Sequence, residues 1–146
     1  MTDTADLTLS TADLDVEKLL APWAWLLGKT VYKPILLNKF GDWFLEDEEG
    51  GVHRLSIVEG TLETVADTVA DFHRLAESPD NVENWFSPDL VHLMTKHGFG
   101  LKPGECYWYK LAPILGGQPE PDNMEPMKLA FCQTLAAQIA RTNRKS

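Results

Sequence analysis

Two stretches of alternating residues around one acidic loop constrain the fold of this chain more than any other feature. In residues 42–46, the large apolar side chains of Trp43 and Leu45 fall on one side of an extended chain, and their neighbours fall on the other. Residues 52–59 alternate in the same way. The loop between them, residues 47–51, is acidic and ends in two glycines that tolerate positive φ. This pattern predicts a β-hairpin.

Further strands and helices are predicted around that hairpin. Residues 35–37 form a short apolar strand, and Pro34 places its beginning at a sheet edge or outside the ladder. A later strand spans residues 105–111 and ends before a proline and two glycines. Helices are predicted at residues 68–76, 88–97 and 127–142, and loops at 78–81 and 118–123. The predicted class is α+β: an antiparallel sheet, made of a β-meander plus the later strand, with helices packed on one face.

Capping residues and apolar stripes set the limits and faces of these helices. Thr68 with Asp71 has capping-box spacing, although an earlier start at Thr64 with Asp67 fits equally well. Ser87 and Pro88 open the next helix. The expected inward stripe of the helix at residues 88–97 is Leu90, Leu93, Met94 and His97. The expected inward stripe of the helix at residues 127–142 is Phe131, Leu135 and Ile139, with Cys132 and Ala136 alongside.

The N-terminal region is predicted to contribute only a tail and one helix. Residues 1–9 are polar and acidic and are expected to fray. Thr11 is placed to cap a helix over residues 12–20. We therefore divide the chain into a tail with a short helix, residues 1–22, and a single α+β domain, residues 23–146.

The formal net charge of −9 over 146 residues limits the possible partners. Such a field repels nucleic-acid phosphates and anionic membranes and attracts a basic protein, although it also serves solubility alone. The N-terminus lacks the basic and apolar regions of a secretory signal, and no apolar run is long enough to span a membrane. We expect a cytoplasmic protein that binds neither nucleic acid nor membrane directly.

No group of residues in the sequence has the spacing of a catalytic or metal site. His92 and His97 lie five residues apart, so they point in different directions on a helix, and neither His53 nor His73 has a companion ligand nearby. Cys106 lies next to Glu105, which raises rather than lowers a thiol pKa, and Cys132 is distant in sequence. We predict buried free thiols, no metal, no cofactor and no enzymatic activity.

Two features are candidates for partner contact. The acidic run Glu46, Asp47, Glu48 and Glu49 lies at the predicted hairpin tip, where it forms either an electrostatic contact surface or an ordinary solvated turn. Trp85 and Phe86, just before a capped helix, serve either as a packing staple or as an exposed anchor.

From Trp25 to about Ile139 the sequence resembles the C-terminal domain of bacterial type VI secretion immunity proteins, a former domain-of-unknown-function family that protects a cell from its own DNase effector. The resemblance lies in residues 38–42, the turn at 47–52, Asp71 with Phe72, and residues 107–117, in matching order and spacing. Longer members of that family carry a preceding domain, often GAD-like; about two dozen residues precede Trp25 here, so we expect that domain to be absent or reduced to one helix.

The resemblance implies an immunity-type protein that binds and neutralises a toxin through protein contact, and the expected toxin is a basic nuclease. Two alternatives stay open at this stage. One is a general interaction or adaptor module, and the other is a small-molecule-binding protein or enzyme with a pocket near Tyr107, Trp108 and His53. The oligomeric state is not indicated by the sequence.

Overall fold

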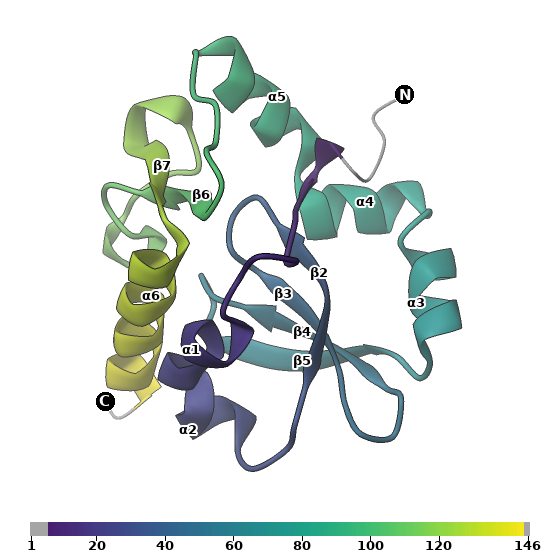
Figure 1. Cartoon of the computed structure of the whole chain (residues 1–146). Coiled ribbons are helices and arrows are strands. Elements are labelled where there is room, and N and C mark those ends of the chain that lie inside the picture. The colour runs from purple at the N-terminus through teal and green to yellow at the C-terminus, as the bar shows by residue number, and fades with distance from the viewer. Residues whose placement is uncertain (1–5, 145–146) are drawn as a thin grey trace.

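The computed structural model describes residues 6–144 of the chain (Figure 1). Its strands are β1 (Thr8–Leu9), β2 (Lys33–Asn38), β3 (Trp43–Glu46), β4 (Val52–Ser56), β5 (Thr61–Ala66), β6 (Glu105–Tyr109) and β7 (Met124–Lys128). Its α-helices are α1 (Val16–Leu20), α2 (Ala24–Leu27), α3 (Val69–Leu75), α4 (Pro79–Phe86), α5 (Pro88–Lys96) and α6 (Leu129–Arg144). Short 3₁₀ turns are η2 (Ala21–Trp23), η3 (Pro113–Leu115) and η4 (Pro121–Asn123). The predicted α+β class is confirmed.

The strands form two antiparallel sheets. The larger has five strands in the order β1-β2-β3-β4-β5, and the smaller contains only β6 and β7. The prediction that the later strand joins the meander was therefore wrong, because β6 pairs along its whole length with β7. One backbone hydrogen bond, from Tyr107 N to Lys39 O at 2.8 Å, ties the small sheet to the turn between β2 and β3.

The β3–β4 hairpin has the predicted faces, but β4 ends at Ser56 and residues 57–60 form the turn into β5, so the predicted strand over residues 52–59 was too long. Trp43 lies opposite Leu55, and Leu45 lies opposite His53, so these four residues share one face of the sheet. A second hairpin follows, in which β4 pairs with β5 and Arg54 lies opposite Glu63. Strand β5 ends the sheet, because β4 is its one neighbour in the strand order.

Helices cover both faces of this sheet, which corrects the prediction of one covered face. Trp43, on one face, packs in a cluster with Trp23 of η2 and Cys132 of α6. Phe44, on the opposite face, packs in a cluster with Phe72 of α3 and Trp85 of α4. Figure 1 accordingly shows α1, α2 and α6 on one side of the sheet and α3 and α4 on the other. Consecutive aromatic residues on β3 bury both faces, since successive strand residues point in opposite directions.

The N-terminal region is more ordered than the sequence indicated. Residues 1–5 lie outside the described part, but Thr8 and Leu9 pair with β2, so fraying through residue 9 was wrong. Leu7 is only 1% exposed and packs in the cluster of Phe44, which supplies the free energy that holds this segment. Asp15 rather than Thr11 caps α1, because its Oδ1 accepts a hydrogen bond from Lys18 N. The division into residues 1–22 and 23–146 stays a prediction.

Two elements were missed between the predicted helices. Residues 78–81 were expected to be a loop, but α4 begins there, with Pro79 in its first turn where a proline N–H is not needed. Strand β7 was missed because Pro126 interrupts its pattern; proline is tolerated since β7 pairs on one side only. As a result, α6 begins at Leu129 rather than at residue 127. The Thr68 cap of α3 is confirmed, with Asp71 N donating to Thr68 Oγ1 at 3.1 Å.

The inward faces of α5 and α6 differ from the predicted stripes. On α5, Val91 and Met94 are buried, whereas Leu93 is 39% exposed. On α6, Phe131 is 54% exposed, and the buried residues are Leu129, Cys132, Gln133, Ala136 and Ala137. The small alanines allow α6 to lie close to the sheet, while the larger Phe131 lies outside the contact.

Candidate functional site

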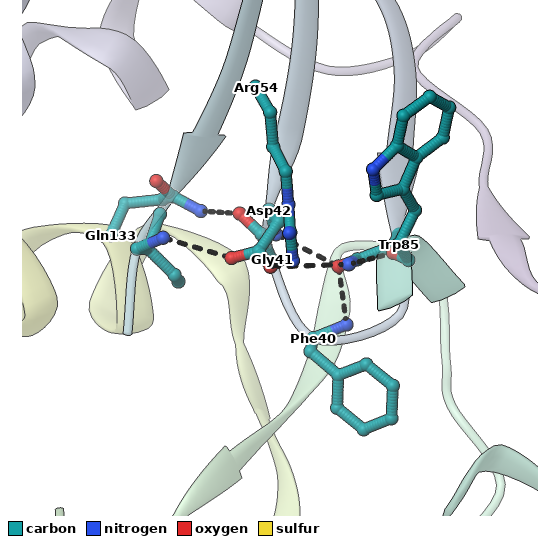
Figure 2. Close-up of polar contacts among 8 residues, drawn as sticks. Phe40, Gly41, Asp42, Arg54, Trp85 and Gln133 are labelled. Carbon is teal, nitrogen blue, oxygen red and sulfur yellow. Dashed lines mark hydrogen bonds and ion pairs between the residues drawn. The ribbon is translucent and has the colours of Figure 1, made fainter. Parts of the chain in front are cut away.

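The turn between β2 and β3 is the polar centre of the molecule. Asn38 Oδ1 accepts hydrogen bonds from the backbone N–H groups of Phe40 and Asp42, both at 2.9 Å. Asn38 Nδ2 donates to the carbonyl oxygen of Trp85, at the end of α4, at 2.9 Å. One buried asparagine therefore shapes its own turn and also fixes the position of α4. Figure 2 shows Phe40 and Asp42 of this turn beside Trp85.

Gln133 fixes the same turn from the other side. Its Nε2 donates to Gly41 O at 2.9 Å, and its Oε1 accepts from the indole Nε1 atoms of Trp23 and Trp43 at 2.8 and 3.1 Å. Gly41 has φ +89°, and a Cβ at this position would lie 2.8 Å from Ile57 Cδ1. A glycine is therefore required where α6 meets the turn. Periodicity did not identify Gln133, because a polar residue counts against an inward helix face.

Asp42 and Arg54 form a largely buried ion pair beside this turn. Asp42 Oδ2 lies 3.2 Å from Arg54 NH2, and Asp42 Oδ1 accepts from Ile57 N at 2.9 Å. Burial raises the pKa of Asp42, while Arg54 and the bond from Ile57 act in the opposite direction. The buried Arg54 Nε has no hydrogen-bond partner among the described residues. The ion pair ties β4 to the turn between β2 and β3.

Two hollows open on either side of Arg54. One has a volume of about 410 Å³ and is bounded by Asp42, Glu59, Glu83, Asp89 and Trp108, among others. The other has a volume of about 600 Å³ and lies between β5 and α4; its lining includes Glu59, Glu63, Asn81, Asn84 and Trp85. Arg54 and Glu59 line both. The carboxylates in the linings outnumber the single arginine, so both hollows favour cationic groups.

The predicted acidic hairpin forms, but its four acidic residues are not equivalent. Asp47 is a turn residue: its Oδ1 accepts from the N–H groups of Glu49 and Gly51, and its Oδ2 lies 2.6 Å from His53 Nε2. The bond to His53 is the main reason that the pKa of Asp47 is lowered. Glu48 and Glu49 are exposed, and Glu48 Oε1 accepts from Val31 N at 3.3 Å. Glu46 is half-buried at the end of β3.

The remaining residues singled out from the sequence have structural surroundings. Trp85 and Phe86 are 7% and 0% exposed, so they are packing residues rather than an exposed anchor. A hydrogen bond with Cys132, followed by burial, raises the pKa of Cys106. Both thiols are free and buried, as predicted.

The small-molecule alternative required Tyr107, Trp108 and His53 to share one pocket. Trp108 lines the smaller of the two hollows beside Arg54, and Tyr107 packs with Met94 and Met124 in a separate cluster. His53 is held in the hairpin by Asp47 and lies 3.1 Å from Thr64 Oγ1. The structure does not bring these three side chains together.

No set of three or more His, Cys, Asp or Glu side chains converges to hold a metal ion within residues 6–144. No helix in the same range is both long and apolar enough to cross a membrane.

The fold and these surfaces define a small acidic α+β protein whose buried polar groups hold its structure and whose hollows carry negative charge. The family described as "T6SS immunity protein Tdi1, C-terminal" matches residues 66–140, and the chain belongs to this family. The match includes Asp71, Phe72 and residues 107–117 of the sequence resemblance, whereas residues 38–42 and the acidic hairpin precede it.

A solved structure supports the fold. The crystal structure of Atu4351 from Agrobacterium tumefaciens superposes with a TM-score of 0.58 at 20% sequence identity. The alignment covers 86% of this chain and 65% of that one, so this chain spans less than two thirds of the length of its neighbour. No curated protein sequence matches this chain significantly.

Proposed function

We propose that this protein neutralises a toxic type VI effector by binding it. The observation that carries the proposal is the family match over residues 66–140, which names an immunity protein. An immunity protein has to recognise its toxin, and the proposed partner is therefore the cognate effector, a basic protein and, following the family resemblance, a nuclease. We place this interaction in the cytoplasm.

The proposed mechanism is contact rather than catalysis. Two of the buried groups with shifted pKa values, Asp42 and Cys106, are held by Arg54 and Cys132 within the fold. Such shifts are common at catalytic sites but also arise in structural networks, and the partners here favour the second reading. A net charge of −9 would accelerate association with a basic effector and make it sensitive to salt.

We propose that the acidic hairpin, comprising Glu46, Asp47, Glu48 and Glu49, forms part of the contact surface. Because Asp47 holds the turn, its replacement would disturb the hairpin itself. Glu48 and Glu49 are the exposed members, so they offer the cleaner test.

The experiment measures both inhibition and affinity. The cognate effector is purified, and its toxic activity is assayed with increasing amounts of the chain; equimolar inhibition is expected. Titration calorimetry then compares the wild type with the double variant Glu48→Gln and Glu49→Gln. The control carries Glu17→Gln and Glu125→Gln, which remove two exposed charges from α1 and β7. A chain that neither binds nor inhibits the effector would refute the proposed function. Equal affinities of the three proteins would remove only the hairpin from the contact surface.

A further inference from the structure

The outer edge of β5 is an unused strand edge beside an acidic hollow. Strand β5 has six residues and pairs with β4 alone in the sheet. Within residues 6–144, the backbone of residues 61–66 makes no hydrogen bond to any other element. Such an edge presents alternate N–H and C=O groups that can pair with a further strand.

The opposite edge of the same sheet is protected against pairing with a further strand, in contrast to the edge at β5. There β1 pairs with Leu37 and Asn38, and the remainder of β2, which β1 does not reach, contains Pro34, which has no N–H to donate. Strand β5 contains neither proline nor lysine, the residues that commonly prevent edge pairing. Its sequence, Thr-Leu-Glu-Thr-Val-Ala, includes three β-branched residues that favour extended structure.

Charge on this edge is also uncompensated. Glu63 lies directly opposite Arg54 in the strand register, yet the Arg54 guanidinium pairs with Asp42 instead. Glu59 and Glu63 are both exposed, and within the described part of the chain neither has an ion-pair partner. Both line the hollow of about 600 Å³ between β5 and α4.

We propose that β5 accepts an extended segment of the effector as a sixth strand, with alternate lysine or arginine side chains of that segment entering the hollow beside Glu59 and Glu63. Strand addition supplies the backbone hydrogen bonds, and residues at alternate positions of the added strand all point to the face that α4 borders. Basic side chains complement the two unpaired carboxylates there. This inference rests on the proposed function and specifies how the effector is recognised.

The test uses the full chain and the purified cognate effector. Hydrogen–deuterium exchange of the complex should show slowed exchange of backbone amides in residues 61–66. The double variant Glu59→Lys and Glu63→Lys should weaken binding by at least about tenfold, because like charges then face each other across the contact. The control, Glu17→Lys and Glu125→Lys, changes the net charge by the same amount away from β5 and should stay within about threefold of the wild type. Urea unfolding confirms that both variants are folded.

The outcomes separate this inference from the proposed function. Wild-type binding with unchanged exchange at residues 61–66, or equal weakening by the two double variants, overturns strand addition and leaves neutralisation standing. Absence of any complex with the wild-type chain overturns both. Slowed exchange at β5, together with selective weakening by the Glu59 and Glu63 changes, supports the inference.

Discussion

Replacing Gln133 with leucine tests whether one buried amide holds α6 to the sheet. The side chain is fully buried and makes three hydrogen bonds, to Gly41 O and to the indole N–H groups of Trp23 and Trp43. Leucine has a similar volume, so Gln133→Leu removes the polar partner while leaving little empty space. Two buried donors and one buried acceptor would then lack partners.

The expected cost follows from those three groups. Each buried polar group left without a partner costs about 1–3 kcal/mol, and the leucine recovers part of this through apolar contact, so we expect a loss of about 3–6 kcal/mol. Domains of this size are stable by about 5–15 kcal/mol, so a wild type at the lower end of this range would become close to unfolding at 37 °C in the variant.

Equilibrium unfolding in urea, followed by tryptophan fluorescence, measures this loss directly. Gln138→Leu is the matched control, because Gln138 lies on the same helix but is exposed. The control should change the free energy of unfolding by no more than about 0.5 kcal/mol. A loss below about 1 kcal/mol for Gln133→Leu, with an unchanged urea dependence, would show that the three hydrogen bonds do not hold α6 in place.

Three further predictions concern the hairpin, α6 and the β4–β5 turn. The pKa of Asp47 is lower in the folded than in the unfolded protein, so its carboxylate stabilises the fold above the unfolded pKa of about 3.9. This stabilisation is lost as the pH falls through the folded pKa. Asp47→Asn should therefore lower the urea midpoint at pH 7, and the difference from the wild type should shrink progressively below about pH 4. Leu129→Ala should lower the free energy of unfolding by about 2–5 kcal/mol, because Leu129 is buried. Phe131 is half-exposed, so Phe131→Ala should lower it by less than about 1 kcal/mol. Equal losses would contradict the register of α6. A Cβ on Gly60, which has φ +67°, would collide with the Cβ of Ala140, so Gly60→Ala should cost about 1–3 kcal/mol. Adding Ala140→Gly should recover part of that cost in a double-mutant cycle measured by thermal unfolding. If the free-energy effects of the two single substitutions were strictly additive, the collision would be excluded.

The sequence predicted those structural features that depend on residues adjacent in the chain. The β3–β4 hairpin follows from alternation and glycine, and the Thr68 cap follows from side-chain chemistry within one turn. By contrast, Phe131, Leu135 and Ile139 have the same four-residue spacing as a buried stripe, although Phe131 lies outside. What decides the register of α6 is Gln133, whose partners Trp23 and Trp43 are about a hundred residues away in sequence.

The same distinction applies to the candidate surfaces. The acidic hairpin was visible because its residues are consecutive. The hollow beside β5 combines Glu59 and Glu63 with residues of α4, and its charge depends on Arg54 pairing with Asp42 instead of Glu63. The turn at residues 38–42 determines that Arg54 pairs with Asp42. Local sequence patterns do not predict this pairing.

The two acidic surfaces should therefore affect different steps of binding. In the hairpin, the carboxylate of Asp47 is hydrogen-bonded to His53 and to two backbone N–H groups, so much of its charge is compensated within the protein. Beside β5, Glu59 and Glu63 have no ion-pair partner among residues 6–144, and Glu63 lies on the strand whose outer edge is unpaired. Long-range attraction depends on the total charge and governs association, whereas close contacts govern dissociation. Neutralising Glu48 and Glu49 should therefore mainly slow association in low salt, while Glu59→Gln with Glu63→Gln should mainly accelerate dissociation. Surface plasmon resonance at two salt concentrations resolves the two rates, and identical kinetic effects of both pairs would show that only net charge matters.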